Sequence, residues 1–527
     1  MEHGASGGLI PRPVTTEARP GVADGGGGWR IRAAEPALDA LAATLDDLLA
    51  PHLGPRPTAD GAAASELLLR FGEPAATARP FGIPPNGAAS DEAYSVTVTE
   101  RGVECVARTP EGVFRAATSA AQLIAASAGR PACRRIDDAP RYAWRGLMVD
   151  PARGFLTPAE LRRIVDLAAL YKLNVLHLHL TDNEGWRLRL PGVPELAAAP
   201  DEPAYTADEF TALQEYAAAR FVTVVPEIDL PGHCAAVRSA FPGLAVPGVP
   251  DEHRAFLDKV GAFASFTPPL DVTDPDTSAT VERVVKEVCA LTRGPYVHIG
   301  ADEAFGMDAD TYAASVRRLR ALVRAHGKQP VAWQESARAG VEAGDIVQYW
   351  TDPSMLDPLD DSAPAPLADI LEAVREVFAE TADDVPRALA GGARVLLSPN
   401  SHLYLDRPYR GDIVPTGQAE HAAHVGFPMY TPSDTARAAA WDPAAQGVPE
   451  DRVAGVEATL FGETVGSFED ACLLLLPRLP GVAEAAWSGS PAPWQEYRGR
   501  LAHHARIWRE RGLAHLAARD VDWIEPG

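Results

Sequence analysis

The feature that most constrains the fold is a repeating rhythm after Pro140, where short apolar runs alternate with amphipathic helical stretches. Strands that are separated by helices pair in parallel, and eight such units over roughly 350 residues are typical of a closed barrel. The sequence therefore predicts an α/β fold with a (β/α)8 TIM barrel over 141–527. The eight candidate strands are 146–150, 174–180, 222–228, 296–300, 330–334, 345–350, 393–399 and 453–461.

One helix start in this region is clearly marked. Thr157 can cap a helix, Pro158 suits its first position, and Glu160 completes a capping box. The pattern predicts a helix between the first two barrel strands.

The chain before the barrel has a different character. Residues 29–140 read as a small α+β accessory domain, with a strand over 92–99, a second over 103–106 and two amphipathic helices. Residues 1–28 are rich in Gly and Pro, which predicts a disordered, mobile tail.

Charge and composition exclude some partners. Lys and Arg number 48 against 72 Asp and Glu, which gives a net charge of −24. This charge argues against nucleic acid and against docking on anionic membranes. The five cysteines are scattered with no CxxC pair, so neither a disulfide framework nor a thiolate metal site is expected. No secretory signal is recognisable at the start, so a cytoplasmic location is expected.

Acidic and aromatic side chains recur where the candidate strands end. In a (β/α)8 barrel the carboxyl ends of the strands meet at one rim, where function collects. Convergence from so many strands is hard to obtain by chance. The residues are Asp150, Arg153, Asp182, Glu184, Trp186, Glu227, Asp229, His233, Asp302, Glu303, Trp333, Glu335, Trp350, Tyr404, Asp406 and Glu463.

This mixture suits a sugar substrate, because pyranose faces stack on aromatic rings and hydroxyls need charged partners. Cleavage of a glycosidic bond also needs a carboxylic acid to protonate the leaving oxygen. A second interpretation rests on His177 and His179, since two histidines on one strand face can bind a metal. Hydrogen-bonded core histidines are the favoured interpretation of this pair, because no further Cys/His cluster completes a ligand set.

Several motifs, in one order, resemble glycoside hydrolase family twenty, the β-N-acetylhexosaminidases, over about residues 90–490. The early unit also resembles the accessory α/β domain of that family. The motifs are RGLMVDPARGF (145–155), YKLNVLHLHLTDNEGWRL (171–188), PEIDLPGH (226–233), HIGADE (298–303), VAWQE (331–335), YLD (404–406), LFGETV (460–465) and PRLPGVAEAAWS (477–488).

The resemblance implies substrate-assisted retention, an exception to the scheme of two catalytic carboxylates. Glu303 would be the general acid and then the base, while Asp302 would hold the 2-acetamido group of the substrate. Two adjacent carboxyls in a sheltered pocket do not both ionise freely. We hypothesise that Glu303 carries the proton and Asp302 the charge. Both can reach one pocket only if the backbone bends after Gly300.

The resemblance also implies the substrate-binding residues. Arg153, Glu463 and Asp406 would bind the sugar hydroxyls, and Asp182 and His233 would orient the acid pair. Trp333 and Trp350 would wall the acetamido pocket, Tyr404 would hydrogen-bond the acetamido carbonyl oxygen, and Phe461 occupies the position of the pocket floor.

Three positions depart from the family pattern. Phe461 stands where a Trp is usual, which keeps an apolar face but makes it smaller and removes an indole N–H donor. Gly154 replaces a common His, and Ala301 replaces a Gly, which is tolerable unless the site needs a positive φ.

The expected function is an exo-acting glycosidase that releases terminal β-linked GlcNAc or GalNAc from a glycan or glycoside, with no cofactor or metal. Alternatives are a metal hydrolase on His177 and His179, a non-catalytic sugar-binding protein, and a relative that releases a disaccharide or transfers the sugar. The long loops 351–392 and 401–452 keep the last alternative open, because pocket depth depends on them. Oligomeric state is left open.

Overall fold

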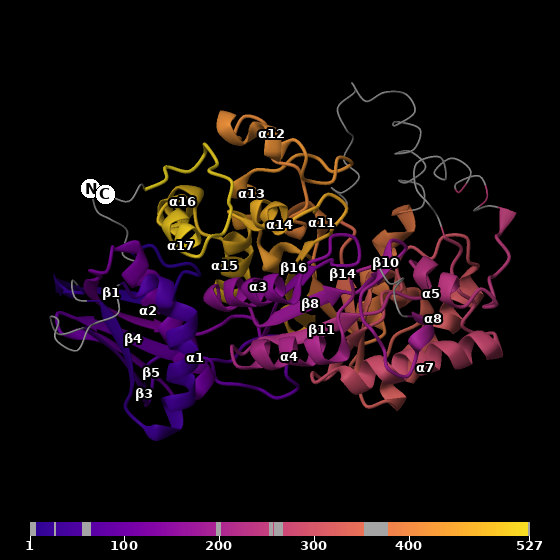
Figure 1. Cartoon of the computed structure of the whole chain (residues 1–527), viewed down its shortest axis with the longest axis horizontal. Coiled ribbons are helices and arrows are strands. Elements are labelled where there is room, and N and C mark those ends of the chain that lie inside the picture. Colours follow the sequence, from indigo (N-terminus) through magenta and orange to yellow (C-terminus); the bar gives the residue numbers. More distant parts are fainter. Residues whose placement is uncertain are drawn as a thin grey trace.

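The computed structural model describes residues 7–25, 28–54, 65–196, 202–251, 254, 257, 267–352 and 378–524. An N-terminal α/β domain lies at one end of the molecule, and a closed barrel with its surrounding helices forms the rest (Figure 1).

The N-terminal domain is built on a mixed sheet of six strands in the order β1-β6-β4-β5-β3-β2. Helix α2 is buried on nearly all sides, because it packs between this sheet and helices α3 and α17 of the barrel domain. The sheet and its helices are β1 (Thr15–Val22), β2 (Trp29–Ala33), α1 (Asp39–Leu49), β3 (Ser65–Phe71), β4 (Tyr94–Thr99), β5 (Gly102–Ala107), α2 (Pro110–Ala126) and β6 (Ala132–Asp138).

The predicted tail over 1–28 is wrong for its described part. Leu9 and Ile10 are buried in the core, and β1 pairs antiparallel with β6 at the edge of the sheet. Most β1 side chains are exposed, so the strand lacks the alternation that marks a half-buried strand, and only its backbone pairing reveals it. Residues 1–6 and 26–27 lie outside the described residues.

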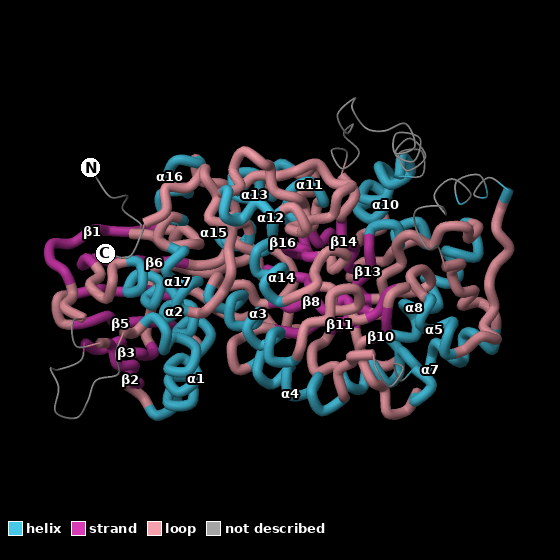
Figure 2. The backbone as a smooth tube through the Cα atoms, turned by 45° about the horizontal axis from the view of Figure 1, so that its top comes forward, coloured by secondary structure: helices cyan, strands magenta, loops and turns pink. Residues whose placement is uncertain are grey.

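The predicted barrel is confirmed. Its eight strands are parallel and close in the order β11-β12-β13-β14-β15-β16-β7-β8, and each lies within a predicted range or within two residues of it. Figure 2 shows these strands at the centre of the helical ring. They are β7 (Trp144–Val149), β8 (Val175–His179), β11 (Thr223–Glu227), β12 (Tyr296–His298), β13 (Gln329–Trp333), β14 (Ile346–Tyr349), β15 (Arg394–Leu397) and β16 (Val453–Leu460).

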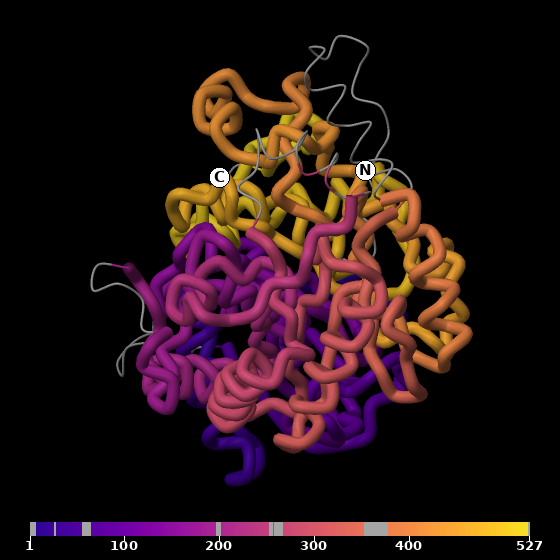
Figure 3. The backbone as a smooth tube through the Cα atoms, turned by 90° about the vertical axis from the view of Figure 1, so that its right-hand side faces the viewer, coloured from indigo at the N-terminus to yellow at the C-terminus, as the bar shows by residue number. Residues whose placement is uncertain are grey.

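Helices cover the barrel, and a two-stranded hairpin of β9 (Thr181–Asp182) and β10 (Gly185–Trp186) follows β8. Among the described residues of the barrel domain, the segment that carries α12 lies at the top in Figures 1 and 3. The helices are α3 (Pro158–Leu170), α4 (Ala207–Ala218), α5 (Ala235–Ala240), α7 (Pro275–Leu291), α8 (Ala309–Ala325), α10 (Asp384–Ala390), α11 (Asn400–Leu403), α12 (Ala419–Ala422), α13 (Thr435–Ala439), α14 (Phe468–Leu475), α15 (Leu479–Ser488), α16 (Trp494–Leu501) and α17 (His504–Glu510).

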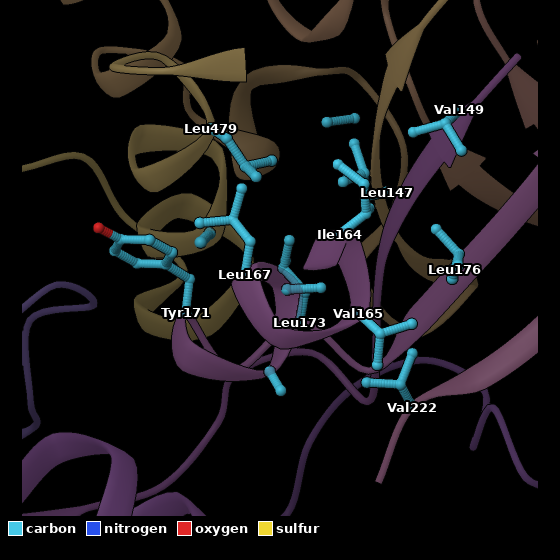
Figure 4. Close-up of a cluster of buried hydrophobic side chains, with 14 of the residues drawn as sticks. Leu147, Val149, Ile164, Val165, Leu167, Tyr171, Leu173, Leu176, Val222 and Leu479 are labelled. Carbon is cyan, nitrogen blue, oxygen red and sulfur yellow. The ribbon is translucent and has the colours of Figure 1, made fainter. Parts of the chain in front are cut away.

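Helix α3 illustrates how sequence sets this architecture. Its predicted capping box is present, because Thr157 accepts from the Glu160 amide and Glu160 accepts from the Thr157 amide. Its apolar face is buried, with Ile164 beside Leu147 of β7 and Leu167 toward Leu479 of α15 (Figure 4). The cap therefore fixes where the helix starts, and the 3.6-residue period fixes which face meets the sheet.

The interior of the barrel is apolar at one end and polar at the other. A layer of buried residues near the strand starts, including Trp144, Val175 and Tyr296, seals the amino end. Polar side chains are thereby confined to the carboxyl end, where the loops that build the site emerge.

All five cysteines are free and buried, so their thiols pack as small apolar side chains. In the described part of the chain, no helix combines the length and apolar character that crossing a bilayer requires.

Candidate active site

The structure brings all the predicted site residues to the carboxyl rim of the barrel. Each sits at the end of a strand or in the loop after it. Arg153 follows β7, Asp182 lies in β9 after β8, His233 follows β11, Asp302 and Glu303 follow β12, Trp333 ends β13, Trp350 follows β14, Tyr404 and Asp406 follow β15, and Phe461 and Glu463 follow β16.

A sharp turn after β12 places the two acids. Gly300, Ala301 and Glu303 all have positive φ, at 68°, 74° and 44°. This is the bend that the two neighbouring acids need to reach one pocket. A Cβ on Gly300 would lie 1.8 Å from Oδ1 of Asp229, so only glycine fits there. Ala301, which stands where the family has a glycine, therefore adopts the left-handed conformation that favours glycine.

The two acids meet at one imidazole. Nε2 of His233 lies 3.8 Å from Oδ2 of Asp302 and 3.4 Å from Oε2 of Glu303. The side chain of Asp302 is 14% exposed and that of Glu303 is 28% exposed, so Asp302 is the more sheltered. Nδ1 of His233 donates to Asp182 at 3.0 Å, and Asp182 also lies 2.6 Å from the Arg153 guanidinium.

Burial, together with the neighbouring carboxylate of Asp229, raises the pKa of Asp302 well above its ordinary value. The sequence-based hypothesis placed the proton on Glu303 and the charge on Asp302. The raised pKa of Asp302 is opposite to that hypothesis, because it favours the protonated form of Asp302. The reason is tertiary, because Asp229 comes from a different strand end and faces Asp302 across the turn. Burial also raises the pKa of Asp229, to about 7.

Aromatic rings from neighbouring strand ends cluster beside the acids. Trp333, Trp350 and Tyr404 form one buried cluster, with Phe461 packed against it. Trp350 stacks on Tyr404 at 6.3 Å between ring centroids, and Phe461 lies 5.3 Å from Tyr404. The motif-based assignment of these rings to one pocket is consistent with this geometry.

Arg153 and two acids, Glu463 and Asp406, belong to the same rim. The Arg153 guanidinium lies 5.7 Å from the Phe461 ring and 3.9 Å from Glu463. Both carboxylate oxygens of Asp406 are buried without a hydrogen-bond partner. Burial and the charge of Glu463 raise the pKa of Asp406 to about 8. Unsatisfied buried oxygens of this kind are suited to accept hydrogen bonds from sugar hydroxyls.

The structure explains the glycine at position 154. A Cβ there would lie 2.7 Å from the carbonyl oxygen of Val465, in the loop after β16. The loop therefore passes too close for any side chain, and a larger residue could enter only if that loop moved.

His177 and His179 are hydrogen-bonded core residues, as favoured from the sequence. Nδ1 of His177 donates to Glu457 at 2.8 Å, and the two ring nitrogens of His179 donate to Glu227 and Asp182. By distance alone, three sets of side chains in the described ranges could hold a metal ion: His177 with Glu227 and His298; His179 with Asp182 and Asp229; and Asp229 with His233 and Asp302. Several of these groups already pair with one another.

Sequence reasoning missed other contributors. Phe305, Phe378 and Tyr430 join the aromatic cluster, but the last two come from long loops whose pattern carried no signal. Glu227 and Asp229 were among the predicted rim residues, but the sequence assigned no role to either of them.

An acid pair at the carboxyl rim of a (β/α)8 barrel, beside a cluster of aromatic rings, is typical of a glycoside hydrolase. The model of the glycosyl hydrolase family 20 catalytic domain matches residues 142–490, and that of domain 2 of the same family matches residues 7–139. The chain belongs to glycosyl hydrolase family 20 and is a β-N-acetylhexosaminidase, which confirms the resemblance seen in its motifs.

Relatives agree over nearly the whole chain. A β-N-acetylhexosaminidase of Cellulomonas fimi is 36% identical over 98% of both chains. The solved N-acetyl-β-hexosaminidase of Streptomyces plicatus, in complex with Thio-NAglucal, is 30% identical with a TM-score of 0.74 and 98% coverage of both chains. The Streptomyces coelicolor β-N-acetylhexosaminidase is 30% identical with a TM-score of 0.73 and 99% coverage of both.

Proposed function

We propose that this site releases terminal β-linked N-acetylhexosamine, with GlcNAc as the principal sugar, from the non-reducing ends of glycans or glycosides. The observation that carries the proposal is the convergence of Asp302 and Glu303 on His233 beside the aromatic pocket. A Streptomyces plicatus variant with 29% identity and a TM-score of 0.73 was solved with the product GlcNAc, which supports this choice of sugar.

In the proposed reaction the sugar supplies the nucleophile. Its acetamido oxygen attacks C1, the bond from C1 to the leaving oxygen breaks, and Glu303 gives its proton to that oxygen. An oxazolinium intermediate results. Glu303, now a carboxylate, takes a proton from water as the water oxygen attacks C1, and the acetamido group is restored with retained configuration.

Asp302 would accept a hydrogen bond from the acetamido N–H and face its developing positive charge. The raised pKa of Asp302 disfavours the ionised carboxylate while the site is free of substrate. A cationic oxazolinium next to Asp302 favours the ionised carboxylate, so the interaction strengthens as the transition state forms. The raised pKa is thereby compatible with the role, and it makes activity depend on pH.

The remaining residues would position the sugar. Trp333 and Trp350 would enclose the acetamido methyl, and Tyr404 would donate a hydrogen bond to the acetamido oxygen. The outer hydroxyls would meet the group formed by Arg153, Asp406 and Glu463. His233 and Asp182 would act as positioning residues for the acid pair. Phe461 would form an apolar floor smaller than an indole.

The decisive variant is Glu303→Gln, tested on aryl β-GlcNAc substrates. We expect a loss of about 10²- to 10⁴-fold in kcat/KM when the leaving group is a poor one such as phenol, because it needs protonation. A strongly activated leaving group should lose less. An unchanged rate with phenyl β-GlcNAc would remove Glu303 from the reaction. An aryl β-glucoside is the matched substrate, since it lacks the acetamido group, and equal rates on both sugars would contradict substrate assistance.

Because the ring of Phe461 is smaller than an indole, release of a disaccharide and transfer of the sugar are the alternative activities to test. Product analysis on β-linked GlcNAc, β-linked GalNAc and chitobiosyl substrates distinguishes them. We expect monosaccharide release, with GlcNAc preferred. A chitobiose product would identify a disaccharide-releasing enzyme, and elongated products would identify transfer.

A further inference from the structure

A buried carboxylate beneath the acid pair contacts both parts of the site. Glu227 is the last residue of β11 and has no exposed surface. In the strand register it lies beside His179 of β8 on one side and His298 of β12 on the other. Side chains in register on parallel strands point to the same face, so Glu227 enters the barrel interior between two imidazoles.

Its first oxygen holds the pocket wall. The indole Nε1–H of Trp333 donates to Oε1 of Glu227 at 2.7 Å. Trp333 is fully buried and its ring lies 6.5 Å from that of Trp350. Because the indole has only one donor, this hydrogen bond fixes the orientation of the ring that walls the proposed acetamido pocket.

Its second oxygen starts a continuous path to the acid. Nδ1 of His179 donates to Oε2 of Glu227 at 2.5 Å, and Nε2 of His179 donates to Asp182 at 2.8 Å. Asp182 accepts from His233 at 3.0 Å, and Nε2 of His233 lies 3.4 Å from Glu303. Hydrogen bonds join the groups of this path as far as His233, whose Nε2 then lies within ion-pair distance of Glu303.

The charges along this path alternate. Burial opposes the charged form of His179, but the carboxylates of Glu227 and Asp150 and the hydrogen bonds to Asp182 and Glu227 raise its pKa well above its usual value. Burial likewise opposes the charge on Glu227, yet the facing His298 and His179 hold its pKa well below the ordinary range. A carboxylate at Glu227 thus keeps an imidazolium at His179.

We propose that Glu227 is a positioning residue for the reaction, which aligns Trp333 through one oxygen and the His179–Asp182–His233–Glu303 path through the other. The inference rests on the proposed function of Glu303 and Trp333. Glu227 is a single buried group that positions the wall of the acetamido pocket and the general acid relative to each other.

The chemistry of Glu227→Gln makes the proposal testable. A carboxylate accepts at both oxygens, whereas an amide has one accepting oxygen and one N–H2 donor. The Trp333 indole can only donate, so in the variant the amide oxygen must stay toward Trp333 and the amide N–H2 must face Nδ1 of His179. His179 can accept there only as a neutral imidazole, so the variant keeps the Trp333 arm and loses the imidazolium at the start of the path to Glu303.

We expect Glu227→Gln to lower kcat/KM by about 100-fold on phenyl β-GlcNAc, the size typical of a misplaced catalytic group. The loss on 2,4-dinitrophenyl β-GlcNAc should be several-fold smaller, because that leaving group needs little help from Glu303. Near-wild-type rates on both substrates, or losses of the same size on both, would overturn the proposal.

Asp138→Asn is the matched control. Asp138 is equally buried and also accepts from an indole, that of Trp487, and from the hydroxyl of Tyr94. It lies at the domain interface, away from the site. This variant should lower the melting temperature and leave kcat/KM on both substrates unchanged. A selective loss with the poor leaving group in this control as well would show a general effect of destabilisation and overturn the assignment.

Trp333→Phe isolates the other arm and remains informative if Glu227→Gln fails to fold. It removes the N–H donor and keeps a ring, so we expect KM for aryl β-GlcNAc to rise while the ratio of rates on the two leaving groups stays constant. An unchanged KM would contradict the pocket arm. In the Trp333→Phe background, the amide introduced by Glu227→Gln can face the ring without a donor clash, so the second change should cost less than it does alone.

The outcomes separate this inference from the proposed function. If Glu303→Gln leaves phenyl β-GlcNAc hydrolysis intact, the proposed function fails. If Glu303→Gln is inactive on that substrate and Glu227→Gln behaves as wild type, only the role of Glu227 fails.

Discussion

At the scale of single residues, the acid pair shows how a shared environment gives two similar groups different tasks. Asp302 and Glu303 adjoin in sequence, but the turn after β12 buries the first more deeply than the second. Asp229 adds a carboxylate beside Asp302 and accepts from the Ala301 amide at 3.3 Å. The pH at which Asp302 ionises is therefore determined more by its neighbours than by its residue type.

The pH dependence follows from that arrangement. Burial and Asp229 raise the pKa of Asp302, so the charge needed for catalysis is lost as pH falls through this raised value. Asp229→Asn removes the neighbouring charge and lowers the pKa of Asp302. The acidic limb of the kcat/KM profile should therefore move to lower pH, measured on an activated aryl β-GlcNAc. A limb that stays in place or moves to higher pH would contradict the coupling.

A second residue-scale prediction concerns the strained turn. Ala301 has a φ of 74°, where an L-residue with a Cβ costs about 1–2 kcal/mol relative to glycine. Ala301→Gly should raise the free energy of unfolding by about 1 kcal/mol, after allowance for the added freedom of glycine in the unfolded chain. Chemical denaturation measures it, with Ala304→Gly, two residues beyond Asp302, as the comparison. A decrease for Ala301→Gly would show that the turn is not strained there.

At the scale of elements, local sequence determines some helices and strands, and tertiary contacts determine others. The capping box of α3 and the apolar face of the helix are both legible in the sequence. Strand β1 is not legible, because its order comes from pairing with β6. Elements whose apolar residues repeat at a regular spacing, such as α3, were predicted from the sequence. The strand β1, which is ordered by pairing at the edge of a sheet, was missed.

The cap of α3 gives an element-scale prediction. Thr157→Ala removes the side-chain acceptor for the Glu160 amide and should cost about 1 kcal/mol of stability. Catalytic rates should stay at the wild-type level, because the helix starts on the outer ring of the barrel. Denaturant unfolding and kcat/KM are the two measurements. The equivalent variant Thr206→Ala, in the capping box of α4, should give a loss of similar size. No loss in either variant would contradict the role of these boxes.

At the scale of the molecule, buried charges join the two domains. Glu92 precedes β4 of the N-terminal domain and accepts from Arg145 of barrel strand β7 at 2.6 Å and from Arg115 of α2 at 2.8 Å. All three side chains are buried. Burial would raise the pKa of Glu92, but the two guanidinium groups hold it below its ordinary value. The carboxylate is thus a charged link between the domains.

Breaking that link should destabilise the whole enzyme. Glu92→Gln leaves the buried Arg145 guanidinium without its carboxylate and Arg115 with Glu111 alone, and breaking a buried pair typically costs about 3–5 kcal/mol. We expect a lower melting temperature and faster proteolysis between the domains, with kcat/KM close to wild type at low temperature. Glu66→Gln, at an exposed ion pair with Arg32, is the control and should change stability by less than about 1 kcal/mol. Equal effects of the two changes would contradict a buried interdomain link.

The sequence by itself determined the barrel, its strand positions and the set of rim residues, because period, capping and strand-end chemistry are local properties. Tertiary structure decided the rest: which carboxylates face each other, that Asp229 raises the pKa of Asp302, and that the loop at Val465 leaves room only for Gly154. It also decided that Glu227 lies between Trp333 and His179. Such relations depend on distances between strands far apart in the chain, and only closure of the barrel sets those distances.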